Sequence, residues 1–220
     1  MIEVRGLTQT FRTRTGPVDA VKGIDFEVRD GEILGLLGPN GAGKTTTLRM
    51  LCTLLKPTAG SAVGARLDGS RGAPPGRRRL RHLAPGGAVA APGAGGPVVG
   101  AATVVQARLQ GMSKAAAQAR MRALLPSLSL EGFEDRALSE MSGGQRRRFD
   151  VALGLVHEPK LVFLDEPTTG LDPQSRANLW DYIRMLRDER GVTIVLTTHY
   201  LDEADALADR IVVMDHGSIV

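Results

Sequence analysis

The chain has 220 residues, of which 42% are hydrophobic and 24% are charged, with a formal net charge of +4. This length allows one good core, with at most a small subdomain. No apolar run is long enough for a membrane helix, and the N-terminus has no apolar leader, so neither a membrane span nor a secretory signal is predicted. The single cysteine, Cys52, lies in an apolar run, which predicts a buried thiol and a reducing cytoplasm.

The positive charge comes from one stretch of the chain. Residues 63–103 contain six arginines and a single acid, Asp68, and the rest of the chain is close to neutral. The charge therefore does not indicate a nucleic-acid-binding face.

The first part of the chain predicts strands that lead into a helix. Residues 2–7 and 21–28 are expected to be strands, and 32–37 a buried strand that runs into a glycine-rich loop. A helix is expected from Lys44 to about Leu55, where Lys56 and Pro57 stop it.

Residues 63–103 fit no such pattern. Gly, Ala, Pro and Arg dominate, and Ile, Lys, Glu, Asn, Gln and aromatic residues are absent. Such a composition is not expected to build a packed element, yet a loop of this length is unusual inside a compact domain. We interpret the stretch as the wrong reading frame of a GC-rich gene, with a shift near Ala62 and a compensating one near Thr103. A native disordered insert is the alternative.

The last part of the chain alternates strands with helices, which predicts an α/β fold with a mostly parallel sheet covered on both faces. Ser142 is expected to cap a helix, and Asp172 with Pro173 to begin another. The chain stops inside its last expected strand, which suggests a truncated fragment. The expected helices cover 104–125, 142–156, 172–190 and 201–208, and the expected strands 161–164, 192–197, 211–214 and 218–220.

The glycine-rich loop has the form of a phosphate-binding loop. Its glycines allow backbone N–H groups to cradle phosphates, Lys44 adds a positive charge, and Thr45 can place a hydroxyl on Mg²⁺. A chance glycine-rich turn is disfavoured, because the loop follows a buried strand and opens a helix. The candidate nucleotide-binding residues are Gly38, Pro39, Asn40, Gly41, Ala42, Gly43, Lys44, Thr45 and Thr46.

Two acids end the apolar strand at 161–164. Asp165 is suited to hold Mg²⁺, and Glu166 can orient or deprotonate an attacking water. Two surface acids are the alternative, but the Thr168-Thr-Gly-Leu-Asp172 run that follows makes it less attractive.

A third candidate segment, Met141-Ser142-Gly143-Gly144-Gln145, lies about twenty residues upstream of these acids. Ser142, Gly143 and Gly144 precede a helix, so their backbone groups and the serine hydroxyl form an anion-binding terminus. An ordinary serine cap would explain Ser142 but not the Gly-Gly-Gln145 that follows.

The order and form of these motifs resemble the P-loop, signature loop and Walker B strand of ATP-binding cassette (ABC) ATPases. The runs 145–148, 154–157, 166–173 and 197–205 closely resemble the daunorubicin-resistance type, whose members power multidrug or antibiotic export through a separate ABC-2 permease. The resemblance implies one P-loop NTPase domain over 1–220. Its RecA-like core and antiparallel β-subdomain would take 1–62 and 157–220, and its helical subdomain 104–156.

The resemblance also implies roles for further residues and partners. His199 would contact the γ-phosphate, and Asp172 would be the D-loop acid. Phe11 would stack on adenine, with an ordinary exposed or core phenylalanine as the alternative. ATP with Mg²⁺ would close a head-to-tail homodimer in which Ser142, Gly143, Gly144 and Gln145 bind the ATP of the partner subunit. A position on the inner face of the cell membrane follows, with no nucleic-acid partner.

One departure concerns the Q-loop, which the family places near Ala84 to Gly87. The glutamine that touches Mg²⁺ there is missing, which leaves hydrolysis and permease coupling in question. Two alternatives to an exporter subunit therefore remain: a soluble ABC ATPase of translation or DNA repair, and a remnant impaired in hydrolysis.

Overall fold

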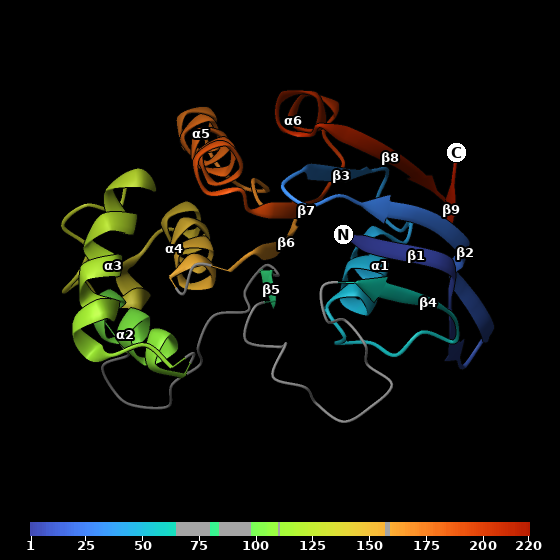
Figure 1. The fold of residues 1–220 in the computed structure, drawn as a ribbon, viewed down its shortest axis with the longest axis horizontal. Helices are drawn as coiled ribbons and strands as arrows, with labels where there is room; N and C mark the ends of the chain where they lie inside the picture. Colours follow the sequence, from blue (N-terminus) through green and yellow to red (C-terminus); the bar gives the residue numbers. More distant parts are fainter. Residues whose placement is uncertain (65–79, 84–97, 110, 157–158) are drawn as a thin grey trace.

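The computed structural model describes residues 1–64, 80–83, 98–109, 111–156 and 159–220. Its centre is a six-stranded sheet in the order β5-β6-β7-β3-β8-β9 (Figure 1). Neighbouring strands are parallel except β8 and β9, which form an antiparallel hairpin. The strands are β3 (Ile33–Leu37), β5 (Leu80–Leu83), β6 (Leu161–Asp165), β7 (Thr193–Thr198), β8 (Arg210–Asp215) and β9 (Ser218–Ile219).

Alternate side chains of the central strands pack into two different hydrophobic cores. Ile194 and Leu196 of β7 belong to the core that contains α4 (Gly143–Leu155) and α5 (Pro173–Arg190). Val195, between them, belongs to the core that contains α1 (Lys44–Leu51). Because successive side chains of a strand point to opposite faces, continuous apolar strands require a cover on both sides. Figure 1 shows α5 and α6 (Leu201–Leu207) above the sheet and α1 below it.

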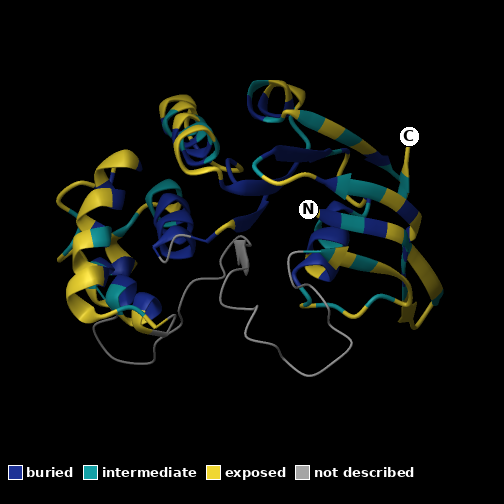
Figure 2. Cartoon of the chain, in the orientation of Figure 1, coloured by how far each residue is buried: buried dark blue, intermediate teal, exposed yellow. Residues whose placement is uncertain are grey.

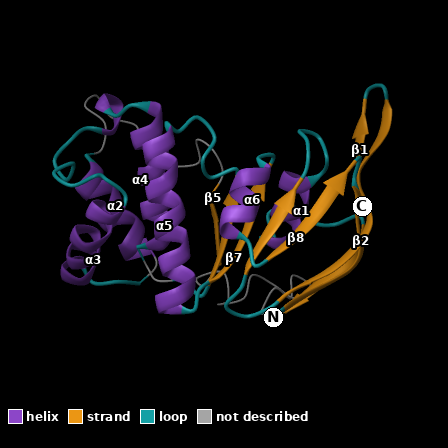
Figure 3. Cartoon of the chain, turned by 90° about the horizontal axis from the view of Figure 1, so that it is seen from above, coloured by secondary structure: helices purple, strands orange, loops and turns teal. Residues whose placement is uncertain are grey.

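A second, three-stranded antiparallel sheet packs on the α1 side, in the order β2-β1-β4. It is formed by β1 (Ile2–Thr13), β2 (Gly16–Val28) and β4 (Ala59–Gly64). The first two strands are longer than the expected 2–7 and 21–28, because backbone pairing continues through polar residues to Thr13 and Gly16. Figure 3 shows this hairpin extending beyond the rest of the sheet.

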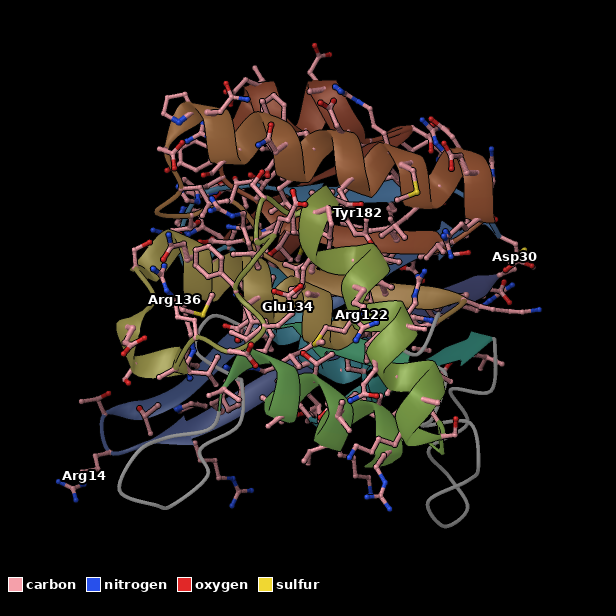
Figure 4. All side chains as sticks on the ribbon, turned by 90° about the vertical axis from the view of Figure 1, so that its left-hand side faces the viewer. Arg14, Asp30, Arg122, Glu134, Arg136 and Tyr182 are labelled. Carbon is pink, nitrogen blue, oxygen red and sulfur yellow. The ribbon has the colours of Figure 1, made fainter. Side chains whose placement is uncertain are left out.

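The described residues between β5 and β6 are mostly helical. The expected helix over 104–125 is two helices, α2 (Val99–Leu109) and α3 (Lys114–Ser127). Gly111 has a φ of +89° between them, and the side chain of Ser113 caps α3 by accepting from Ala116 N. Figure 4 looks onto this region, with Arg122 of α3 and Glu134 beyond it labelled.

The expectation that residues 63–103 build no packed element was wrong in part. Strand β4 runs to Gly64, β5 pairs with β6, and α2 begins at Val99 with Val99 and Ala102 buried. Parallel pairing uses backbone groups, so the edge that β6 offers can bind a strand of unpromising composition. The expected Q-loop position at 84–87 lies outside the described residues.

Other boundaries follow local backbone geometry. Helix α1 ends at Leu51 rather than near Leu55, and Thr53 has a φ of +58°, which a helix cannot contain. The expected starts of α4 and α5 are confirmed, with Ser142 and Asp172 as their N-cap residues. Cys52 is buried, as expected, and burial raises the pKa of its thiol.

The described helices differ in how much of their surface is covered. Figure 2 shows α4 largely buried, whereas α3 exposes much of its outer side. None of these helices is both long and apolar enough to cross a membrane.

Candidate functional site

The sheet brings three of the sequence-predicted segments to one edge. The loop 38–43 follows β3, Asp165 ends β6 and Glu166 comes directly after it, and His199 follows β7. These three strands are parallel neighbours in the order β6-β7-β3. The carboxyl ends of parallel strands are where α/β sheets bind ligands.

The loop after β3 leads into helix α1, whose N-terminus has no side-chain cap. Gly43 is the N-cap residue of α1, with a left-handed φ of +98° and no side-chain cap. The first backbone N–H groups of a helix need partners, and an anion can supply them. Gly38 is wedged against the β8–β9 hairpin, since a Cβ there would lie 2.1 Å from Met214 O. Gly217 N of the same hairpin donates to Ala42 O at 3.2 Å.

Lys44 is folded back onto this loop. It is 4% exposed, and its Nζ donates to Gly38 O at 2.7 Å and to Pro39 O at 2.9 Å. The same atom lies 3.8 Å from Glu166 Oε1. Burial lowers the pKa of Lys44, against the opposing effect of the negative charges of Glu166 and Asp165. The ammonium is thus held at the mouth of the loop, where a phosphate can replace its carbonyl partners.

Asp165 is the point at which hydroxyl groups converge. Its Oδ1 accepts from Thr45 Oγ1 at 2.9 Å and from Thr197 Oγ1 at 2.7 Å. A carboxylate beside a threonine hydroxyl is a hard oxygen donor set, which suits Mg²⁺ together with phosphate and water oxygens. The residues present therefore fit a magnesium ion at this place.

Glu166 adopts an unusual backbone conformation. Its φ is +46°, and its N–H donates to Thr197 Oγ1 at 3.0 Å and to Thr197 O at 3.1 Å. Its Oε1 lies 3.3 Å from His199 Nδ1, and its Oε2 accepts from Thr169 Oγ1 at 3.3 Å. Strained residues of this kind concentrate at functional sites. The carboxylate is consequently placed between Lys44 and His199, at the edge where a phosphate would lie.

The signature segment forms a site of another kind. Ser142 N donates to Gln145 Oε1 at 2.9 Å, and Gln145 N donates to Ser142 Oγ at 3.3 Å, which makes a reciprocal capping box. Ser142 and Gly143 are exposed. Across the described ranges, no hydrogen bond joins this segment to the loop 38–46.

Asp172 and Phe11 are the two remaining residues that the sequence predicts for the site. Asp172 caps α5: its Oδ1 accepts from Ser175 N at 2.9 Å and its Oδ2 from Ser175 Oγ at 2.5 Å. These hydrogen bonds lower the pKa of Asp172. Phe11 is 39% exposed on β1, opposite Val18, so stacking on adenine stays a prediction.

Two residues of the site were missed from the sequence. Thr197 links Asp165 to the backbone of Glu166, and Arg147 of α4 contacts the backbone that carries both acids. In the sequence, the run Gln145-Arg-Arg-Arg148 indicates only a family resemblance. Its composition could not show which arginine turns inward.

Comparison with known proteins shows to which family the chain is similar. The ABC transporter family matches residues 21–169. The daunorubicin/doxorubicin resistance ATP-binding protein of Streptomyces peucetius is 47% identical, over all of this chain and 64% of that protein. A Nod factor export ATP-binding protein of Burkholderia orbicola is 44% identical, over 93% of this chain and 66% of that protein. The chain thus spans about two thirds of the length of these relatives.

Solved structures give the same result for the fold. A dimeric bacterial ABC transporter cassette superposes with a TM-score of 0.85 at 24% identity, over 100% of this chain and 96% of that chain. An ATP-binding subunit of an ABC transporter gives 0.82 at 27% identity, over 100% and 88%. The family match over residues 21–169, which is more than half of the chain, shows that the chain belongs to the ABC transporter family.

Proposed function

We propose that this chain binds and hydrolyses ATP and thereby energises the export of drugs or antibiotics through a separate ABC-2 type permease. The observation that carries the proposal is the convergence of Lys44, Asp165 and Glu166 at the edge of one sheet. Their distances and shared partners connect a phosphate-binding loop to an acid pair.

The site residues divide the work of hydrolysis. The loop amides and Lys44 bind the β- and γ-phosphates, while Thr45 and Asp165 hold Mg²⁺, which neutralises phosphate charge when bound. Glu166 orients or deprotonates the attacking water, and His199, 3.3 Å from it, contacts the γ-phosphate. Phe11 stacks on adenine.

The second half of each ATP site comes from another copy of the chain. Ser142, Gly143, Gly144 and Gln145 bind the γ-phosphate of ATP held by the partner subunit, and Asp172 links the two shared sites. The exposure of Ser142 and Gly143 supports this arrangement, because the segment is free to meet a partner. Among the relatives, the names of the resistance and Nod factor proteins point to export. The assembly would lie on the inner face of the membrane and would have no nucleic-acid partner.

Substitution of Glu166 tests the chemistry. Glu166→Gln removes the base and is expected to lower kcat by about a hundredfold or more while ATP binding is retained. Hydrolysis is measured as phosphate release with Mg²⁺, and binding with a fluorescent ATP analogue. Glu189→Gln, on the exposed end of α5, is the matched control and should hydrolyse ATP like the unchanged protein.

Two results would contradict the proposal. The unchanged protein could fail to release phosphate, or Glu166→Gln could hydrolyse ATP at the original rate. The export role is tested separately by isolating the tagged protein from its host cells. Retention of a polytopic membrane protein supports the role, and retention of ribosomes alone opposes it.

A further inference from the structure

One arginine of helix α4 contacts the backbone of the two acids, Asp165 and Glu166. Arg147 of α4 is only 7% exposed. Its Nη2 donates to Asp165 O at 2.6 Å and to Glu166 O at 3.1 Å, and its Nε donates to Pro167 O at 3.2 Å. A single guanidinium thus spans three consecutive carbonyls, which its planar array of donors allows and an ammonium does not.

The turn that it contacts needs support from both sides. The positive φ of Glu166 is a conformation that non-glycine residues rarely adopt. From one side, Thr197 accepts the N–H of Glu166. Arg147 holds the carbonyl of the same residue from the other side. The backbone of Glu166 is therefore fixed at both its donor and its acceptor.

Electrostatics give the same arginine a second connection to the acids. Burial lowers the pKa of the Arg147 guanidinium, and the negative charges of Asp150, Asp165, Glu166 and Glu203 oppose this effect. Glu203 is 1% exposed on α6, where it accepts from Trp180 Nε1 at 3.2 Å. Because the interior screens charge weakly, a fixed cation here offsets the clustered negative charge behind the site.

We propose that Arg147 is a positioning residue for hydrolysis. It fixes the position of the Glu166 carboxylate and connects the Glu166 turn to helix α4. Ser142 begins the same helix, and the intervening residues span only about 7 Å at the rise of an α-helix. Movement of the helix when its exposed end meets ATP therefore moves the catalytic turn of its own subunit. The inference deepens the proposed function and rests on it.

Arg184 offers a matched control. Its Nε and Nη2 donate to Ala206 O at 3.1 and 2.9 Å, so it also holds a backbone carbonyl with two donors. It lies on α5, and this contact holds the end of α6 rather than the Glu166 turn. Arg184→Lys and Arg147→Lys thus each remove a guanidinium that donates to backbone carbonyl oxygen.

The first experiment compares these variants by steady-state hydrolysis, ATP binding and thermal unfolding. Arg147→Lys should lower kcat by about 10- to 100-fold and leave KM within about threefold, because ground-state binding does not use the turn. Arg184→Lys should keep kcat within about twofold at a similar shift in Tm. Arg147→Gln, which keeps two amide donors, is a second variant in case the lysine variant does not fold. Equal kcat values in the Arg147 and Arg184 variants would overturn the proposal.

A double substitution separates positioning from a general structural role. If Arg147 acts through Glu166, then Arg147→Lys causes no further loss of residual hydrolysis in a Glu166→Gln background. An additive loss would show that it acts elsewhere. An unchanged protein that does not hydrolyse ATP would instead refute the proposed function, and this inference with it.

Discussion

Two loops of this protein place glycines at the start of a helix, and they end in opposite ways. The loop before α1 has no side-chain cap, is wedged against β8, and buries its lysine. The loop before α4 closes its own capping box and leaves Ser142 and Gly143 exposed. The N-terminus of α1, which is uncapped and packed against β8, suits an anion bound within the subunit. The N-terminus of α4, which is capped and exposed, suits an anion that a partner subunit holds. In the proposed function, these two similar sequence patterns serve the two halves of one shared site.

The sharpest way to break this contrast is to add one methyl group to each loop. In Gly38→Ala the new Cβ would lie 2.1 Å from Met214 O, so we expect a loss of about 3 kcal/mol in the free energy of unfolding. In Gly143→Ala the methyl group meets nothing within 4 Å, and stability should change by at most about 0.5 kcal/mol. Urea unfolding of both variants measures the difference.

The Gly143→Ala variant also tests whether this loop meets ATP held by a partner subunit. Gly143→Ala should keep its stability and its ATP binding. Its kcat should fall by about tenfold or more, because the methyl group would crowd the bound phosphate. Hydrolysis by stable Gly143→Ala at the original rate would show that this loop does not meet ATP.

Two serine caps give a smaller and more selective test. Ser142→Ala and Ser113→Ala each remove a side-chain cap, from α4 and from α3, and each should cost about 1 kcal/mol of stability. Only Ser142→Ala should also lower the hydrolysis rate. Thermal unfolding and phosphate release are measured on both, and equal activities would place Ser142 among the purely structural caps.

The smallest expected effect concerns pH. Hydrogen bonds from Ser175 hold the pKa of Asp172 below its ordinary value of 3.8. The cap of α5 therefore contributes stability above that value, and the contribution is lost as the pH falls through the lower folded-state pKa. The difference in Tm between the unchanged protein and Asp172→Ala should shrink at acid pH. The corresponding difference for Ser142→Ala should stay flat, since serine does not titrate; parallel curves would contradict the prediction.

Much of the core could be predicted because its signals are local. Continuous apolar strands identified β3, β6 and β7, and the Asp172-Pro173 and Ser142 caps set the starts of α5 and α4. The loop 38–46 and the acids at 165 and 166 follow directly from those strand ends. Their convergence then follows from parallel strand order alone.

The failures come from interactions that local sequence does not record. Strand β5 depends on the free edge of β6, and the far ends of β1 and β2 depend on each other rather than on an apolar pattern. Arg147 could not be told from its arginine neighbours, because its inward direction depends on the packing of α4 against the strand ends. Composition misled most at Val99, where small apolar residues pack a helix within a stretch that reads as a linker.

The hairpin behind the phosphate loop has one more consequence. Met214 fills the space that a side chain at Gly38 would need, and Gly217 holds Ala42 by a backbone hydrogen bond. Residues about 175 positions away in the sequence thus shape the loop by packing against it. A chain cut after Val213 would keep every side chain proposed to meet ATP, and would still lose the contacts that shape the proposed phosphate loop.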